Sequence, residues 1–239
     1  MDESLYEPEF VRRLFNEMAQ TYGVVNLISS LGFSARWRKQ CIHRIAIPPG
    51  ATVVDFMTGM GELCPSLARR VGRDGIVRAI DISPEMCRRA RVQANRCPCT
   101  IEVLEADALL NTLPSASADV VVSSFGLKTF SNEQLGLLAK QTARLLKPGG
   151  QFSFLEISVP QNRWLRLPYM FYVKRLIPLI GKVMLGNPEN YRMLGTYTEA
   201  FGNCEAFKRE CDQSGLVVKE ASYFFGCATG VFGHKPASP

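Results

Sequence analysis

Apolar and polar positions alternate along most of this chain in a pattern that predicts strands and helices in turn. Short runs rich in valine and isoleucine predict strands, and longer segments with apolar residues three and four apart predict helices between them. The expected strands cover 51–56, 76–80, 100–105, 118–123, 151–157, 216–223 and 227–234. The expected helices cover 8–20, 34–45, 62–71, 84–95, 133–146 and 205–214. This alternation predicts one α/β domain with a mostly parallel sheet and helices on both faces.

The strand and helix rhythm breaks between 158 and 200, where large apolar and aromatic residues gather. We therefore divide the single domain 1–239 into an N-terminal helical cap 1–48, a core 49–158, an insertion 159–200, and a C-terminal helix and strands 201–239. The insertion fits a lid over a substrate, the interpretation we favour, or a helix lying on a membrane surface. Its interleaved charges exclude a membrane-spanning helix; they are Arg163, Arg166, Lys174, Arg175 and Lys182.

Composition narrows the function classes. The chain has 239 residues and a formal net charge of +6, and its basic residues fall mostly where a helix would face solvent. No basic stripe with interleaved aromatic residues is present, so we expect no nucleic-acid partner. The acidic start of the chain is unlike a signal peptide, and we expect a cytoplasmic protein. Eight cysteines lack metal-finger spacing, and the close pair Cys97 and Cys99 is one residue short of CxxC, so we expect reduced structural thiols and no metal.

The segment VVDFMTGMGEL at 53–63 follows the first expected strand and opens a helix. Gly59 and Gly61 permit a tight turn beside unpaired helix N–H groups. Asp55 at the strand end could accept from the cationic amino-acid part of S-adenosylmethionine, whereas it would repel a pyrophosphate. A plain strand-to-helix turn would carry the same glycines, so the loop alone leaves both interpretations open. The candidate cofactor contacts in this loop are Asp55, Met57, Thr58, Gly59, Met60 and Gly61.

Two further acidic residues end the next two strands. Asp81 in AIDIS (79–83) lies about 20 residues beyond the glycines, the spacing at which a carboxylate can accept both ribose hydroxyls. Asp107 in EADAL (105–109) could accept from the adenine amino group. The alternative is that Asp81 only caps the following helix, for which Ser83 is another N-cap candidate. Further cofactor candidates are Ile82, Ala108 and, at the end of the fourth strand, Ser124.

The chain also contains LFNEMAQTYGVVNLISSLGFSARWRK, SFGLK, LLKPGG, FLEISVPQN, FYVKRLIPLIGKVM, NPENYRML and TGVFGHKP. With this series it resembles, over nearly its whole length, the UbiE/COQ5 group of class I methyltransferases, which C-methylate the ring of quinone precursors. The resemblance implies a Rossmann-like class I methyltransferase fold with a seven-stranded sheet, an N-terminal helical region and a lid. It implies cofactor contacts from Met60, Asp81, Asp107, Ala108 and Ser124, and an acceptor pocket near Tyr22, Asn26, Tyr172, Tyr191 and Tyr197.

Two departures from the family pattern concern the chemistry. The family's glycine loop reads closer to D-x-x-G-G-T-G-D, so Thr58, Met60 and Glu62 are substitutions within it. Where the quinone enzymes typically carry Arg-Asn, thought to organise the water that removes the ring proton, this chain has Lys128 and Thr129. Lysine keeps the positive charge but loses the planar fork of arginine. The resemblance therefore implies a divergent relative that acts on a different aromatic or enolic acceptor.

We therefore expect an S-adenosyl-L-methionine-dependent methyltransferase that C-methylates a small hydrophobic aromatic, quinol-like or enolic acceptor, with catalytic candidates Lys128, Glu156 and Tyr191. Hydrogen bonds to local backbone are an equally good reading of Glu156, and His43 and His234 are poor candidates for a base. Three alternatives remain: N- or O-methylation of a small metabolite, a different reaction of the same cofactor, and a non-catalytic partner subunit. Peripheral membrane contact and a homodimer are further expectations.

Overall fold

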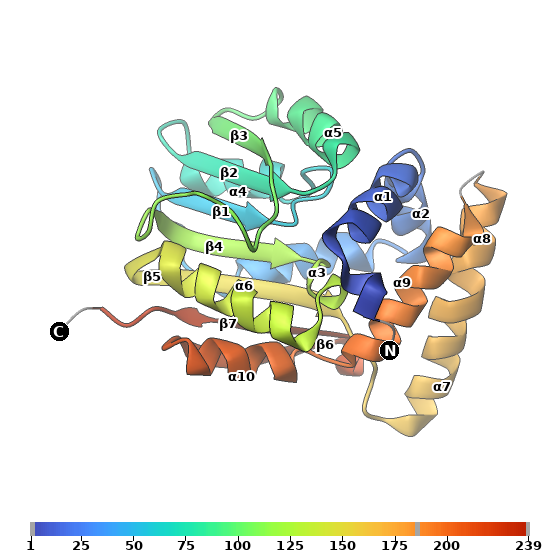
Figure 1. The fold of residues 1–239 in the computed structure, drawn as a ribbon. Helices are drawn as coiled ribbons and strands as arrows, with labels where there is room; N and C mark the ends of the chain where they lie inside the picture. Colours follow the sequence, from blue (N-terminus) through green and yellow to red (C-terminus); the bar gives the residue numbers. More distant parts are fainter. Residues whose placement is uncertain (1–2, 185–186, 238–239) are drawn as a thin grey trace.

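Seven strands form one sheet at the centre of the computed structural model, which describes residues 3–184 and 187–237 (Figure 1). The sheet order is β3-β2-β1-β4-β5-β7-β6; the first five are mutually parallel, and β7 runs antiparallel to β5 and β6. The expected seven-stranded, mostly parallel fold is confirmed. The strands are β1 Thr52–Phe56, β2 Ile76–Asp81, β3 Thr100–Glu105, β4 Ala118–Ser124, β5 Leu146–Ile157, β6 Val217–Tyr223 and β7 Ala228–His234.

Helices cover both faces of the sheet because successive side chains of a strand point to opposite sides. Val54 and Val121 belong to a buried cluster with α6 and α10, whereas their neighbours Val53 and Val122 belong to one with α3 and α4. Both faces of the central strands are therefore buried, as the near-continuous apolar runs indicated. The flanking helices are α3 Phe33–Ile42, α4 Cys64–Val71, α5 Pro84–Ala94, α6 Asn132–Leu145 and α10 Glu205–Gln213.

Local sequence signals explain where several elements begin. Ser83 caps α5 by accepting from the Met86 N–H at 3.1 Å, as its position predicted. Ser131 and Gln134 form a reciprocal capping box at the start of α6. β5 begins at Leu146, five residues before the expected strand, with a register irregularity against β4. The glycine turn that was expected to precede the strand thus lies within it, with Gly149 at φ +78°.

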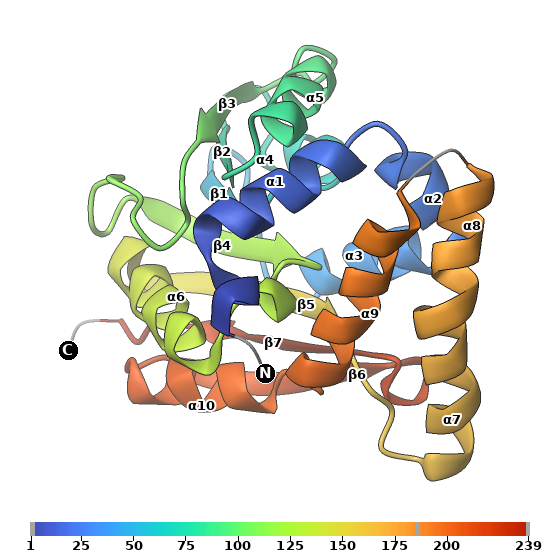
Figure 2. The same cartoon turned by 45° about the vertical axis from the view of Figure 1, so that its right-hand side comes forward.

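A second, helical layer lies beyond the carboxyl ends of the parallel strands, on the right of Figure 1; in Figure 2 its helix α1 comes in front of the sheet. Its helices come from the N-terminal cap and the insertion: α1 Pro8–Met18, α2 Tyr22–Ser29, α7 Arg163–Phe171, α8 Ile177–Val183 and α9 Pro188–Phe201. A π-helical turn at Tyr172–Leu176 joins α7 to α8. Helices α2 and α9 had not been predicted. Helix α9 begins where Asn187 accepts from the Glu189 N–H and proline occupies the first position.

The cap and the insertion pack on each other although they are far apart in the sequence. Leu14 and Met18 of α1, Val25 of α2, and Tyr191 and Tyr197 of α9 form one buried cluster. A Cβ at Gly181 of α8 would lie 2.3 Å from the Tyr191 ring, so only glycine allows α8 and α9 to approach this closely. The insertion is therefore a helical layer fixed to the N-terminal cap.

Candidate active site

A cleft with about 820 Å³ of empty space opens where β1, β2, β3 and β4 end. Eight of the predicted cofactor residues line it: Met57, Thr58, Gly59, Asp81, Ile82, Asp107, Ala108 and Ser124. The predicted residues Asp55, Met60 and Gly61 are not among its lining residues. Helix α1 and the turn before it close the cleft from above with Tyr6, Pro8, Val11 and Phe15, which the sequence had not indicated.

Asp81 holds the glycine loop in place and also faces the cleft. Its Oδ2 accepts from the Gly59 N–H at 2.8 Å and its Oδ1 from the Ser83 N–H at 2.9 Å. Burial, opposed by these backbone hydrogen bonds, raises the pKa of Asp81 to about 6. Each carboxylate oxygen has a further lone pair, so Asp81 can still accept from ligand hydroxyls. The helix cap is Ser83, which argues against the alternative that Asp81 serves only as a cap.

Asp55 lies beneath the loop rather than on the cleft wall. It is 1% exposed, and its Oδ2 accepts from the Thr58 hydroxyl at 2.6 Å. Its Oδ1 is buried without a hydrogen-bond partner within the described structure. Burial raises the pKa of Asp55 to about 7. In this geometry Asp55 supports the loop through Thr58. It does not line the cleft, where a direct contact with the ligand was expected of it.

Met60 and Gly61 face neighbouring helices instead of the cleft. A Cβ at Gly23 of α2 would lie 2.7 Å from Met60 Cε, so Met60 packs on the N-terminal cap. Gly61 has φ +79°, and a Cβ there would lie 3.3 Å from the Ala90 Cα of α5. The second glycine therefore permits close helix packing. Asp107 remains at the cleft, where its Oδ1 accepts from the Leu109 N–H at 2.8 Å.

An ion pair missed by the sequence analysis lies at the cleft wall. Arg38 Nη2 of α3 is 3.1 Å from Glu62 Oε1, and Arg38 Nε donates to the Ser124 hydroxyl at 3.3 Å. Glu62 Oε2 accepts from the Met60 N–H at 3.0 Å. Among the cleft-lining residues of the described structure, Arg38 is the only cation. This ion pair could not be predicted from the sequence. Arg38 belongs to a basic run on a helix, and such runs usually face solvent; only the packing of α3 on the sheet places Arg38 at the cleft.

Two residues in left-handed backbone conformations follow adjacent strands at the cleft. Met57 after β1 has φ +49° and Phe125 after β4 has φ +66°. The Arg38 guanidinium lies 4.9 Å from the centroid of the Phe125 ring, within the range of a cation–π contact. Such conformations are unfavourable for bulky residues and gather at functional sites. Phe125 is therefore held in place from both its backbone and its ring.

A second cavity, with about 530 Å³ of empty space, adjoins the cleft and shares Tyr22 and Phe125 with it. Its other lining residues, mostly apolar, are Val25, Asn26, Ser29, Lys128, Ile157, Val173, Ile177, Tyr191, Leu194 and Thr198. The structure thus brings Tyr22, Asn26, Lys128 and Tyr191 together as predicted. Tyr172 and Tyr197 are not among the lining residues; their hydroxyls donate to the carbonyls of Ser29 and Leu5.

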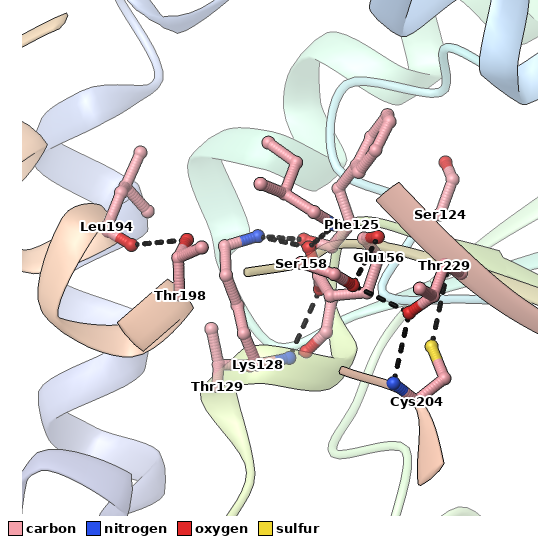
Figure 3. Close-up of polar contacts among 12 residues, drawn as sticks. Ser124, Phe125, Lys128, Thr129, Glu156, Ser158, Leu194, Thr198, Cys204 and Thr229 are labelled. Atoms are coloured by element: carbon pink, nitrogen blue, oxygen red, sulfur yellow. Dashed lines mark hydrogen bonds and ion pairs between the residues drawn. The ribbon is translucent and has the colours of Figure 1, made fainter. Parts of the chain in front are cut away.

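Lys128 and Glu156 form a buried ion pair at the floor of this cavity (Figure 3). Lys128 Nζ is 2.8 Å from Glu156 Oε1 and donates to the Phe125 carbonyl at 3.0 Å. Two of the three ammonium donors are thus used; the third has no acceptor among the described residues, and Lys128 lines the cavity. Glu156, which is fully buried, also accepts from the N–H groups of Lys128 and Ile157. Glu156 therefore holds Lys128 and does not line the cavity. This agrees with the alternative that Glu156 serves to bind local backbone N–H groups.

The remaining polar groups near the cavity are poor bases. Burial raises the pKa of Tyr191, although its hydrogen bond with the Thr21 hydroxyl at 2.9 Å opposes the rise. Burial also raises the pKa of Tyr22. The Thr129 hydroxyl donates to the Gly126 carbonyl at 2.8 Å. At neutral pH these groups can orient a ligand, but they remain protonated.

A Rossmann-like sheet, a cleft at the carboxyl ends of its parallel strands, and an adjoining apolar cavity define the class of S-adenosylmethionine-dependent methyltransferases. The ubiE/COQ5 methyltransferase family model matches residues 3–235, and the chain belongs to that family. It is 31% identical to the demethylmenaquinone methyltransferase of Thermus thermophilus over 93% of this chain and 100% of the relative. It is 30% identical to the ubiquinone/menaquinone biosynthesis C-methyltransferase UbiE of Hydrogenovibrio crunogenus over 86% of this chain and 81% of the relative.

Solved structures share the fold at lower identity. A SAM dependent methyltransferase from Aquifex aeolicus superposes with a TM-score of 0.57 and 21% identity, over 82% of this chain and 88% of that one. The cyclopropane synthase MmaA2 from Mycobacterium tuberculosis superposes with a TM-score of 0.55 and 15% identity, over 79% and 62%. These likenesses confirm the class I methyltransferase fold. With the family membership they identify the chain as a methyltransferase enzyme that uses S-adenosylmethionine.

The residues at the cleft fit this cofactor. Asp81 offers a carboxylate with free lone pairs for hydroxyl donors, and the Gly59 turn brings backbone close to the cleft. Arg38 and Glu62 present opposite charges, as a zwitterionic amino-acid group requires. No group of three or more His, Cys, Asp or Glu in the described ranges could hold a metal. All eight cysteines are free thiols.

Proposed function

We propose that this enzyme C-methylates the ring of a hydroxylated aromatic acceptor of the quinol type. The observation that carries the proposal is the apolar cavity with one buried ammonium, Lys128, directly beside the cofactor cleft. A cavity of this composition suits a flat apolar ring with one polar substituent. The names of the relatives from Thermus and Hydrogenovibrio agree with this acceptor class.

The cleft residues have separate roles in this proposal. Asp81 accepts from the ribose hydroxyls and Asp107 from the adenine amino group. Arg38 binds the carboxylate of the methionine end and Glu62 its ammonium, because the pair already places both charges side by side. When bound, S-adenosylmethionine supplies an electrophilic methyl group. Phe125 and Tyr22, which line both cavities, keep water from the space between donor and acceptor.

Lys128 activates the acceptor by electrostatics. Its third N–H donates to the ring oxygen and stabilises the negative charge of an acceptor whose hydroxyl has released its proton to solvent before binding. That charge is shared with the neighbouring ring carbon, which becomes the nucleophile. After methylation the ring proton passes to water when the product leaves, which restores aromaticity. Glu156 keeps the ammonium in position through two contacts with Lys128. The pair therefore prepares the acceptor in a site closed to bulk water.

Lys128 and Thr129, in place of the family's Arg-Asn, restrict the range of acceptors that the site can activate. Thr129 already donates its hydroxyl proton to Gly126, so it is not placed to order a water as an asparagine would. Activation then depends on Lys128 alone, a compact charge that contacts one oxygen rather than two. We therefore expect acceptors whose ring hydroxyl is comparatively acidic and carries no neighbouring oxygen that must be held at the same time.

The test is methyl transfer from isotopically labelled S-adenosylmethionine to a panel of a naphthoquinol, a benzoquinol, a catechol and a primary amine. Mass spectrometry and NMR of the product locate the new methyl group. We expect methylation of a quinol ring carbon. Methylation of oxygen or nitrogen would support the small-metabolite alternative, and cofactor binding without transfer to any of the panel would overturn the proposal.

A further inference from the structure

Exposed apolar side chains concentrate on the helices that cover the acceptor cavity. Of the sixteen large apolar residues exposed in the described structure, twelve lie here. Trp164, Leu31 and Phe225 are 80%, 82% and 80% exposed. We call this surface the lid face; its twelve residues are Val24, Leu27, Ile28 and Leu31 of or next to α2, Trp164, Leu167 and Phe171 of α7, Leu176, Leu179 and Val183 of or next to α8, and Phe224 and Phe225 between β6 and β7.

These segments form one continuous surface. Helices α2 and α8 contact each other, and α7 continues into α8 through the π-helical turn. The Tyr169 hydroxyl of α7 donates to the Cys227 carbonyl at 3.0 Å, which joins α7 to the turn between β6 and β7. Figures 1 and 2 show α2, α7 and α8 along the same side of the molecule, away from α6. The lid face is therefore one surface built from connected segments, and a gathering of exposed apolar side chains of this kind is typical of an interaction site.

The exposed apolar residues of α7 and α8 recur at helical spacing, so they share one side of these helices. Trp164, Leu167 and Phe171 recur three and four positions apart, as do Leu176, Leu179 and Val183. Met170, next to Phe171, and Val173, between the two sets, are buried on the opposite, inner side. The inner face of this helical rod packs on the protein, and a second apolar face remains for another partner.

The charged side chains on the helices of the lid face are all basic, and the two glutamates near Phe225, Glu205 and Glu220, form ion pairs with Arg209 and Lys208. Neither 18–54 nor 157–188 contains an aspartate or glutamate. Seven exposed basic side chains in these segments form no ion pair with any described carboxylate; they are Arg36, Lys39, Arg44, Arg163, Arg166, Arg175 and Lys182. A surface that combines large apolar side chains with unpaired cations matches a bilayer with anionic headgroups, which buries the first and attracts the second.

The turn between β6 and β7 adds an independent observation. Phe224 and Phe225 both adopt left-handed backbone conformations, with φ +43° and +55°. Glycine or asparagine is usual at such positions, and a bulky side chain is strained there. The chain accepts this strain while keeping the Phe225 ring in solvent. Aromatic rings held in this way would be buried if the turn dipped into the interfacial layer of a membrane.

The same helices form the wall of the acceptor cavity. Helix α2 turns Val25 and Asn26 toward the cavity while Leu27 and Ile28 face outward, and Ile177 of α8 lines the cavity beside the exposed Leu176. We propose that the lid face docks on an anionic membrane surface and that the acceptor passes from the bilayer between α2 and α8 into the cavity. The passage of an acceptor rests on the proposed function; the docking does not. No helix in the described ranges is long and apolar enough to span a membrane.

Vesicle sedimentation of the full chain tests the docking without cofactor or acceptor. The probes are vesicles of phosphatidylcholine mixed with phosphatidylglycerol, and vesicles of phosphatidylcholine alone. We expect binding to the mixed vesicles that weakens as salt is raised. The variant Arg175→Gln/Lys182→Gln should lose about fivefold in partition coefficient for each charge removed. The variant Trp164→Ser/Phe225→Ser should lose on the order of tenfold for each ring.

The control is Leu137→Ser/Lys140→Gln on α6, which removes one exposed side chain of each kind, apolar and basic, far from the lid face. It should bind vesicles like the unmodified chain. Equal losses in the control and the lid-face variants, or no binding by the unmodified chain, would overturn the docking. Thermal melts of all variants should agree within a few degrees because every substituted side chain is exposed.

Two further measurements separate this inference from its alternatives. If a second copy of the chain covers the lid face, light scattering without lipid will show a dimer that Trp164→Ser/Phe225→Ser converts to a monomer, and vesicles will not compete. Vesicle binding without methyl transfer to any quinol would contradict the proposed function alone. Transfer to a tail-less, water-soluble quinol by a chain that ignores vesicles would contradict the docking alone.

Discussion

The two adjoining cavities are built in opposite ways. The cofactor cleft lies at the ends of four strands and is lined by carboxylates, glycines and one arginine, each tied to nearby backbone or to the ion pair. The acceptor cavity is mostly apolar. Its walls come from α2 and from the π-helical turn, α8 and α9, which follow α2 by more than a hundred residues in the chain. Phe125 and Tyr22 belong to both.

This difference separates a general task from a particular one. The cleft must hold a charged ligand with several hydroxyl groups. Carboxylates at strand ends can bind such a ligand in any parallel sheet, because the strand ends meet at one edge. The cavity must fit one acceptor, and its shape depends on how separate helices pack. Among the described residues that line it, Lys128 is the only charged one. Substitutions should therefore affect cofactor binding and methyl transfer separately, depending on which cavity they touch.

Removal of Lys128 should have the largest effect on methyl transfer. Because the proposal places its ammonium on the oxyanion of the acceptor, Lys128→Met should lower kcat/KM on the order of 100- to 1000-fold while S-adenosylmethionine still binds. The same variant leaves Glu156 as an unpaired buried charge, which should cost about 3 to 5 kcal/mol of unfolding free energy. Steady-state kinetics, calorimetric titration and urea unfolding measure the three quantities.

The double variant Lys128→Met/Glu156→Gln distinguishes chemistry from folding. Glu156→Gln removes the stranded charge but keeps only one oxygen for the two backbone N–H groups, which donate to different oxygens of Glu156, so a part of the unfolding free energy should return. Methyl transfer should remain lost. Recovery of activity together with stability would mean that Lys128 serves only the fold, and the contrast between the two cavities would fail on the acceptor side.

Asp81→Asn should weaken cofactor binding about 100-fold, with the effect confined to the cleft. The amide loses the charge-assisted hydrogen bonds with ligand hydroxyls, each worth about 1.5 to 3 kcal/mol. Because burial raises the pKa of Asp81 to about 6, affinity of the unmodified chain for S-adenosylmethionine should fall as the pH drops through about 6. Calorimetric titration across this pH range should show that dependence disappear in the variant. An unchanged affinity would remove Asp81 from the site.

The sequence predicted the cleft far better than the cavity, for a physical reason. Asp81, Asp107 and Ser124 follow strands, and the topology of a parallel sheet places all strand ends at one edge, so local patterns sufficed. Tyr172 and Tyr197 were placed by resemblance, but their orientation depends on helix packing, and both point elsewhere.

Helices α2 and α9 escaped prediction because their apolar faces divide between the cavity and the cap, which blurs the periodicity of a single buried stripe. Asp55 shows the limit of the strand-end argument on the cofactor side. The residue stands where predicted, but the loop covers it, and Thr58 and Gly59 reach the cleft in its place. A residue's position along a strand is thus predictable, whereas its access to a cavity requires the three-dimensional arrangement.

Arg38 offers a finer test within the cleft, with an effect of about tenfold. If its guanidinium binds the carboxylate of the cofactor's methionine end, the unmodified chain should prefer S-adenosylhomocysteine over 5′-methylthioadenosine, which lacks that end. Arg38→Met should lose most of this preference by weakening only the first ligand. Calorimetric titration with the two ligands gives the ratio directly.

The control for Arg38 is Arg36→Met on the same helix, where the side chain is exposed. It should leave the ligand preference unchanged. Arg38→Lys should restore part of the preference, because it keeps one charged donor. If Arg38→Met weakens both ligands equally, Arg38 acts through Phe125 and Ser124 on the shape of the cleft, and its role would be one of positioning.

The smallest expected effect on methyl transfer concerns the buried Asp55, which does not line the cleft and whose titration is followed through stability in the absence of cofactor. Its pKa in the folded chain is raised to about 7 from a reference of 3.8, so between these values the folded state binds more protons than the unfolded state. By linkage, the free energy of unfolding should fall as the pH rises from about 4 to about 7 and then level. Asp55→Asn cannot ionise and should lose this part of the decline, on the order of 4 kcal/mol for a shift of about three pKa units, although Asp81 still contributes. The pH dependence is the informative quantity, because the amide leaves its own buried group at the unpartnered Oδ1 position and shifts the absolute stability. Urea unfolding at both pH values measures it, and equal declines in the two chains would show that Asp55 stays ionised beneath the loop, so that the cleft would hold a permanent negative charge behind Thr58.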